Sequence, residues 1–357
     1  MLFGYPIAAT NVNWLHECLF DSIRILHDAV DAGVPYPDWP NVLPMVYRVL
    51  LASKSGLRDR LSAYDKAIRR LSQRNRDAII QAMESQNRIP DLLSCACDCP
   101  TIEDLPKSVR APLKALFDYA YDRLKDFGLR DPHYNAIYAA IPEPVCPFCG
   151  TEPFEAPGLT REDLDHYLPK SLYPFAAANL RNLVPMGNKC NTGYKKTTDL
   201  LRRTDKMRRT VIDPYIHTAI VVSLNESEPF DGDDPDIPKW QIEFEPDSPA
   251  VATWDEVFRV RDRYRHNHLN RHYKEWLDHF RKSVIRSGRK VDSDHDLIEA
   301  LRWYEDHYRD DGLHGGAFLR AAVFCMLRLH CENGDQRLLK VIKDLVAPSA
   351  ALTAMAS

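Results

Sequence analysis

The chain has 357 residues, which is enough for a large hydrophobic core or for several lobes. Its composition, 45% hydrophobic and 27% charged, is ordinary for a globular protein, and its net charge of -4 points to no particular partner. There is no apolar run of about eighteen residues, which argues against a transmembrane helix and a membrane partner. Nine cysteines without a repeated spacing, and a start unlike a secretory signal, predict a reducing, cytoplasmic setting.

Residues 1–140 are predicted to form a mainly helical lobe. Apolar residues at helical spacing predict a helix over 13–30, and a long, charged helix is expected over 64–83. A third helix is expected to begin near Pro112 and to end before Gly128, because proline suits a helix start and glycine a helix end.

Three thiols stand at alternate positions in Cys95-Ala96-Cys97-Asp98-Cys99. They could bind a metal. The alternative is a loop with partly buried thiols, which we favour because zinc ligands more often have two to four residues between them.

The second half of the chain is predicted to contain a β-hairpin and then helices. In 213–250, two short runs at 218–224 and 240–244 are rich in β-branched and aromatic residues, which predicts a hairpin with a long acidic connection. Residues 251–357 are predicted to be a basic helical lobe. It comprises a long helical region over 254–286, a helix striped by Leu297 to Tyr308, one striped by Phe318 to Leu329 that stops at Asn333-Gly334, one over Leu338 to Leu345, and a frayed tail over 347–357.

Between the lobes, residues 141–212 concentrate the groups that phosphodiester hydrolysis requires: a base for the water, a divalent ion for the phosphate and a nearby cation. The imidazole of His166 suits the base because its ordinary pKa is near neutral. Asp165 and Asn191 offer oxygen ligands for Mg²⁺ or Mn²⁺. Lys195 or Lys196 could face the phosphate. Because adjacent strand residues point to opposite sides, Asp165 and His166 can share one site only if the backbone bends or the phosphate lies between them.

The order of these motifs resembles the HNH endonuclease family. The similarity is carried by Asp165-His166-Tyr167-Leu168-Pro169, then Asn182-Leu183-Val184-Pro185, then Cys190-Asn191 and a following lysine, and it covers about fifty residues. The resemblance implies an α+β, mainly helical chain with a central ββα-metal domain between N-terminal and C-terminal helical lobes. It implies His166 as general base, Asn182 as the residue that holds the histidine loop, and Asp165 and Asn191 as ligands of the catalytic ion.

Many members of this family also carry two Cys-x-x-Cys pairs that bind a structural Zn²⁺. The first pair is present here as Cys146 and Cys149, but the second is reduced to Cys190, since position 187 is glycine. A tetrahedral zinc needs a fourth ligand, which could be His217, one of Cys95, Cys97 and Cys99, or water. The alternative is that the zinc has been lost. Outside this context, Cys146 and Cys149 could instead be a redox pair.

The charge distribution indicates the substrate class. Residues 187–210 carry eight Lys or Arg against two acids and residues 257–290 carry eleven against three, whereas the intervening residues 225–247 hold nine acids. Basic side chains supply phosphate affinity that does not depend on base sequence, although a solvated charged face is the alternative. The acidic segment is expected to be a solvated loop, or else a nucleic-acid mimic over a basic groove. The nucleic-acid contacts we predict are Lys196, Arg202, Arg203, Arg261, Arg265 and His268.

DNA is the substrate we favour, since most members of the family cut DNA, and RNA, including tRNA, is the second choice. A catalytically inactive nucleic-acid-binding module is the alternative from another class. The resemblance also suggests a nuclease subunit of a bacterial anti-phage assembly with an ATPase or other protein partner.

Overall fold

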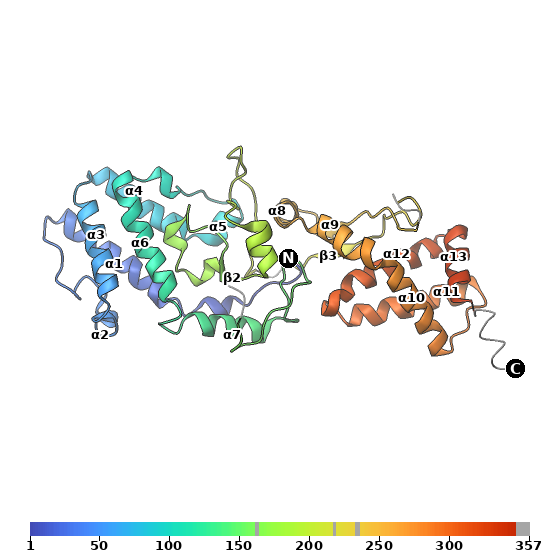
Figure 1. The fold of residues 1–357 in the computed structure, drawn as a ribbon. Helices are drawn as coiled ribbons and strands as arrows, with labels where there is room; N and C mark the ends of the chain where they lie inside the picture. The colour runs from blue at the N-terminus through green and yellow to red at the C-terminus, as the bar shows by residue number, and fades with distance from the viewer. Residues whose placement is uncertain (161–163, 217–218, 233–235, 348–357) are drawn as a thin grey trace. The chain divides into compact units, whose positions relative to one another are not determined.

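The computed structural model describes residues 1–160, 164–216, 219–232 and 236–347. Over these residues, helices dominate and the strands form two small antiparallel sheets, β1-β2 and β3-β4 (Figure 1). The expected class, α+β and mainly helical, is therefore confirmed. None of the helices in these ranges combines the length and the apolar character that crossing a membrane requires.

The first of two compact units comprises Met1, 3–148 and 152–219. Its helices are α1 (Trp14–Asp31), α2 (Arg48–Leu51), α3 (Ser55–Ile68), α4 (Gln73–Gln86), α5 (Ile89–Leu93), α6 (Lys107–Arg123) and α7 (Arg130–Ala140). Shorter helical turns are η1 (Ile7–Thr10), η2 (Met45–Tyr47), η3 (Ile102–Asp104), η4 (Pro174–Ala176) and η5 (Leu180–Asn182). Strands β1 (Leu164–His166) and β2 (Leu183–Pro185) precede η6 (Lys189–Lys195), a π-helical segment.

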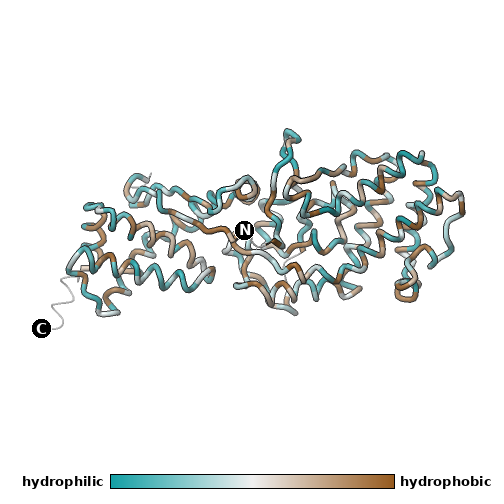
Figure 2. The backbone as a smooth tube through the Cα atoms, turned by 180° about the vertical axis from the view of Figure 1, so that it is seen from behind, coloured by the Kyte–Doolittle hydropathy of each residue, from teal (hydrophilic) through white to brown (hydrophobic). Residues whose placement is uncertain are grey.

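A single hydrophobic core joins the helices of this unit to its strands. Leu19 and Ile23 of α1 and Leu113 of α6 are fully buried in it, together with Phe175 and Leu183 from the β1-β2 region. Figure 2 shows apolar and polar stretches alternating along the helices, as expected when each helix turns one face to a core. The predicted lobe 1–140 and the predicted nuclease segment 141–212 thus share one interior.

Two helix boundaries differ from the prediction. The helix expected over 64–83 is two helices, α3 and α4, separated by residues 69–72. The helix expected to begin at Pro112 begins at Lys107 and contains this proline. Near a helix start the missing N–H of proline removes one hydrogen bond, and the buried stripe that includes Leu116 and Phe117 outweighs it.

The second unit comprises Leu2, 149–151 and 220–357, as far as these residues are described. Its elements are β3 (Val221–Ser223), β4 (Glu243–Glu245), α8 (Pro249–Phe258), α9 (Val260–Arg263), η7 (Tyr264–Leu269), α10 (Asn270–Ser287), α11 (Asp294–Asp310), η8 (His314–Gly316), α12 (Ala317–Glu332) and α13 (Gln336–Val346). Helices α11 and α12 pack side by side, and α13 contacts both (Figure 1).

Most of the sequence expectations for this unit hold. The hairpin is present, with Val222 opposite Phe244, although its strands are shorter than predicted. The stop at Asn333-Gly334 is also present, with Gly334 at φ +84°. The helical region over 254–286 is interrupted at Arg259, whose left-handed backbone (φ +52°) separates α8 from α9. The predicted tail beyond Ala347 lies outside the described residues.

Candidate functional site

The candidate site is built on β1, β2 and η6, in the order strand, strand, helix. The two strands are antiparallel, with Asp165 opposite Val184 and His166 opposite Leu183. The backbone N–H of Tyr167 donates to the Asn182 carbonyl (2.8 Å), so the pairing continues one residue past β1. The loop between β1 and β2 contains the short helical turns η4 and η5 and returns the chain to pair with β1.

The side chain of Asn182 holds the segment that follows His166. It is fully buried, and its Oδ1 accepts the N–H of Leu168 (2.7 Å). Its Nδ2 donates to the carbonyls of Leu168 (3.0 Å) and Ala176 (3.1 Å). Because an amide supplies both a donor and an acceptor, it satisfies backbone groups that an apolar side chain would leave unpaired. The amide of Asn182 therefore fixes the backbone of the segment that follows His166.

Asp165 and Lys195 form a buried ion pair between β1 and η6. Nζ of Lys195 lies 2.8 Å from Oδ2 of Asp165, and it also donates to the backbone carbonyl of His166 (2.8 Å). Burial raises the pKa of Asp165, and the positive charge of Lys195 opposes this shift. The expectation that Lys195 faces a phosphate does not fit this geometry, because its ammonium is buried and already bonded within the chain.

The imidazole of His166 lies on the other side of β1. Its ring packs against that of Tyr121 on α6 (centroids 4.3 Å apart), and its Nε2 is 3.0 Å from the carbonyl of Ala177. A carbonyl only accepts, so Nε2 carries the proton and Nδ1 keeps its lone pair. Burial, reinforced by the charges of Lys170 and Lys195, lowers the pKa of His166 to about 3, so the ring is neutral. The near-neutral pKa for which His166 was chosen as a base is therefore not found in this structure, and a pKa this low makes the ring a weak base.

Asp165 and His166 therefore contact different elements, as strand alternation requires. Their functional groups would share a site only with a ligand between them or after a local rearrangement. Asn191 lies within η6. Its N–H donates to the Gly187 carbonyl (2.9 Å), its carbonyl accepts from Lys196 (2.7 Å), and it is half-buried.

A second cluster lies where the turn 146–152 meets the start of η6. Cys146, Cys149 and Cys190 are buried, and the carboxylate of Glu152 joins them. The four ligand atoms all lie within 4.8 Å of one another, so these residues form a possible metal site. Among the described residues, Cys95, Cys97 and Cys99 form no such group. His217, another candidate for the fourth ligand, lies outside the described residues.

Glu152 is a candidate metal ligand that the sequence did not predict. The spacing Cys146-x-x-Cys149-x-x-Glu152 repeats an interval of three, which could have drawn attention to it. A carboxylate in a short turn is nevertheless common at protein surfaces, so this spacing carries little weight without the folded geometry.

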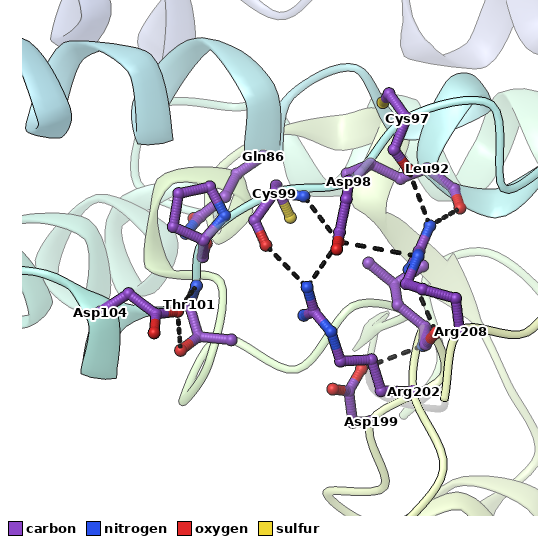
Figure 3. Close-up of polar contacts among 12 residues, drawn as sticks. Gln86, Leu92, Cys97, Asp98, Cys99, Thr101, Asp104, Asp199, Arg202 and Arg208 are labelled. Atoms are coloured by element: carbon purple, nitrogen blue, oxygen red, sulfur yellow. Dashed lines mark hydrogen bonds and ion pairs between the residues drawn. The ribbon is translucent and has the colours of Figure 1, made fainter. Parts of the chain in front are cut away.

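The predicted nucleic-acid contacts differ in their surroundings. Arg202 is bonded within the chain: it pairs with Asp98 (2.5 Å) and donates to the carbonyl of Cys99 (3.1 Å), as Figure 3 shows. Arg208 reaches the same loop and donates to the carbonyl of Cys97 (2.9 Å). These two arginines tie the cysteine loop to the segment that follows η6. Figure 3 shows both arginines bonded to the loop at Cys97 to Cys99. Burial raises the pKa of Cys99 to about 12.

The other basic candidates range from exposed to partly engaged. Lys196 and Arg203 are exposed. In the second unit, Arg261 pairs with Asp255 (2.6 Å), and Arg265 donates to the carbonyl of Trp240 (3.3 Å). His268 is half-buried, 6.3 Å from the ring of Tyr264.

Comparison with known proteins identifies no relative: no family model, no curated protein and no solved structure matches the chain.

Proposed function

We propose that the protein is a metal-dependent endonuclease of the HNH type that hydrolyses phosphodiester bonds, with DNA as the favoured substrate. One observation carries this proposal: β1, β2 and η6 follow one another as the resemblance implies, and the side chain of Asn182 binds the segment directly after His166. Neither feature is needed for a helical scaffold.

In this proposal His166 takes the proton from the attacking water. Its neutral ring is oriented by the Ala177 carbonyl, and the lone pair on Nδ1 accepts the proton. Asp165 and Asn191 would hold Mg²⁺ or Mn²⁺, which when bound supplies positive charge for the phosphate and the leaving oxygen. Lys195 acts as a positioning residue, because its ammonium links the Asp165 carboxylate to the backbone of His166. A structural Zn²⁺ would occupy the cysteine cluster, since thiolates favour zinc over magnesium.

The exposed basic residues Lys196 and Arg203 follow η6 closely and would contact the backbone phosphates of a nucleic acid. Such contacts do not distinguish DNA from RNA, so RNA, including tRNA, stays the second substrate choice. We also propose that the protein acts in an anti-phage assembly with an ATPase or other subunit. Four apolar residues on η2 and α2, each more than half exposed, support a protein partner: Met45, Val46, Val49 and Leu50.

The test is nicking of supercoiled plasmid by the full chain in Mg²⁺ or Mn²⁺, with labelled RNA as a parallel substrate. His166→Ala should reduce the cleavage rate at least about 100-fold, because a general base contributes that much or more. His16→Ala is the matched control. His16 is similarly buried, with its pKa also lowered to about 3, but it lies on α1 and has no proposed catalytic role. Equal loss in both variants, or cleavage that persists in His166→Ala, would contradict the proposal.

An inactive binding module is the second candidate, and the Asp165–Lys195 pair is the observation that favours it. A divalent ion at Asp165 must compete with an ammonium 2.8 Å away. Salt-sensitive nucleic-acid binding by the wild type, with no cleavage in either metal, would support this alternative.

A further inference from the structure

The turn that carries Cys146 and Cys149 is closed by its own backbone. The N–H of Cys146 donates to the carbonyl of Glu152 (2.7 Å), and Val145 pairs with Pro153 across the turn. Gly150 allows the tight reversal, because its φ of +69° is a conformation that other residues rarely adopt. This closure directs the side chain of Glu152 toward the start of η6, where Cys190 lies.

The carboxylate of Glu152 takes up the space beside Gly187. A Cβ placed on Gly187 would lie 2.6 Å from Oε2 of Glu152 and 2.9 Å from its Cβ. Real Cβ atoms essentially never come this close to another atom. A residue larger than glycine at 187 would therefore require Glu152 to move. Gly187 also precedes Cys190 by the interval that separates Cys146 from Cys149. A side chain at position 187 would therefore pair with Cys190 as Cys146 pairs with Cys149. Glu152 occupies the space that such a side chain would fill.

We propose that Glu152 is the fourth ligand of a Cys₃Glu site for Zn²⁺, and that its carboxylate replaces the ligand that Gly187 cannot supply. Three thiolates and one carboxylate meet the tetrahedral preference of zinc, whose Zn–S and Zn–O distances are about 2.3 and 2.0–2.2 Å. The ligand atoms, within 4.8 Å of one another, need only a small contraction to reach a common ion. This site is separate from the catalytic ion and does not depend on nuclease activity.

The hydrogen bonds of Glu152 are compatible with metal binding. Its Oε1 accepts the N–H of Lys189 (2.9 Å), whereas the contact of Oε2 with the N–H of Cys190 is longer (3.3 Å). A carboxylate has lone pairs for both purposes, so Oε1 can keep its bond while Oε2 binds the ion. The same two N–H groups would offset part of the negative charge that three thiolates and a carboxylate bring together. The competing explanation is that Glu152 only binds the start of η6, with no metal.

The experiment measures metal content and spectra, and does not use cleavage. The full chain is refolded with Zn²⁺ or Co²⁺, and bound metal is determined by elemental analysis and by the thiolate-to-cobalt absorption. We expect this absorption in the wild type, and in Glu152→Ala an affinity at least about tenfold weaker, the lower end of what losing even a ligand-orienting group causes. Glu155→Ala is the matched control, since it removes a carboxylate from the same segment outside the cluster. It should bind like the wild type.

Two further variants separate the metal site from the structural explanation. Glu152→Gln keeps an oxygen acceptor for the N–H of Lys189, so this variant should fold. Its amide is a poor zinc ligand, so its metal affinity should be weaker than that of the wild type. Gly187→Cys combined with Glu152→Gly, which removes the Cβ of residue 152 as well as its carboxylate, should restore tight binding. The thiolate-to-cobalt absorption should then be stronger, because four thiolates replace three. Gly187→Cys alone should not bind metal more tightly than the wild type, because the added Cβ meets the side chain of Glu152.

Three results would overturn the proposal: no thiolate-to-cobalt absorption in the wild type, wild-type affinity in both Glu152 variants, or no recovery in the double variant. None of these readouts requires a nucleic-acid substrate. The metal measurements and the cleavage assay can therefore fail independently. The protein could cleave without binding zinc here, or bind zinc here without cleaving.

Discussion

Nζ of Lys195 lies 2.8 Å from Oδ2 of Asp165, and the two side chains are only 1% and 11% exposed. The pair joins the helical segment η6 to strand β1 in the middle of the candidate site. In such a position each charge depends on the other, because an isolated buried charge is strongly unfavourable.

Lys195→Met should destabilise the fold by about 3–5 kcal/mol, since it leaves the Asp165 carboxylate buried without its ammonium. Lys195→Met combined with Asp165→Asn should recover much of this loss, because no buried charge is left without a partner. Urea unfolding of each variant gives the free energies. Lys189→Met, which removes an exposed lysine from the same segment, should change stability by less than about 0.5 kcal/mol. If Lys195→Met matches that control, the ammonium is not paired with Asp165.

Asn182→Ala should reduce the free energy of unfolding by about 1–3 kcal/mol, because it removes three buried hydrogen bonds to Leu168 and Ala176. Asn182→Asp should be at least as damaging, since a carboxylate oxygen then faces two carbonyls in place of a donor. Thermal unfolding would compare both with Asn188→Ala, an exposed asparagine nearby. An aspartate variant as stable as wild type would contradict the orientation of this amide.

Acid should destabilise the protein through its buried histidines. Burial lowers the pKa of His166 and of His16 from 6.5 to about 3. Between pH 6.5 and about 3 the unfolded state binds a proton that the folded state does not, so stability falls as the pH falls. Each histidine contributes about 1.4 kcal/mol per pH unit in this window.

The measurement for this pH effect is the urea midpoint at several pH values from 7.5 to 4.5. His166→Asn should flatten the dependence, whereas replacement of the exposed His295 should leave it unchanged. An unaltered slope in His166→Asn would show that the pKa of this ring is the same in the folded and unfolded states.

Substitutions of the neighbours Arg202 and Arg203 should have different effects, because the two side chains have different surroundings. Substitution of Arg202 should mainly change stability, whereas substitution of Arg203 should change DNA affinity. Arg203 is exposed, so Arg203→Gln should weaken DNA binding and lower the salt slope by about one. Arg202 is bonded to Asp98 and to the Cys99 carbonyl, so Arg202→Gln should destabilise the fold by about 1–3 kcal/mol. Fluorescence anisotropy across a salt series, together with urea unfolding, tests both. The reverse pattern would mean that Arg202 is released from Asp98 to bind DNA.

Local patterns in the chain were enough to predict much of the fold. Helix α1, the helices α11 to α13 and the β3-β4 hairpin follow from the spacing of apolar residues and from stop signals such as Gly334. These features are decided within a few turns of backbone, so neighbouring residues suffice to specify them. The prediction was wrong where the backbone departs from its local preference, as at the left-handed Arg259, a position at which glycine would be expected.

The candidate site shows the same division between local and distant information. The residue types and their order, from Asp165 and His166 through Asn182 to Asn191, can be read along the chain, and the proposed chemistry rests on them. The burial of Lys195 against Asp165 and the approach of Glu152 to Gly187 were not, because each joins residues about thirty or more positions apart. Only the packing of η6 against β1 and against the turn 146–152 brings those groups within bonding distance. Whether a lysine faces solvent or a buried carboxylate, and whether a glutamate lies at the surface or among thiols, is decided by that packing.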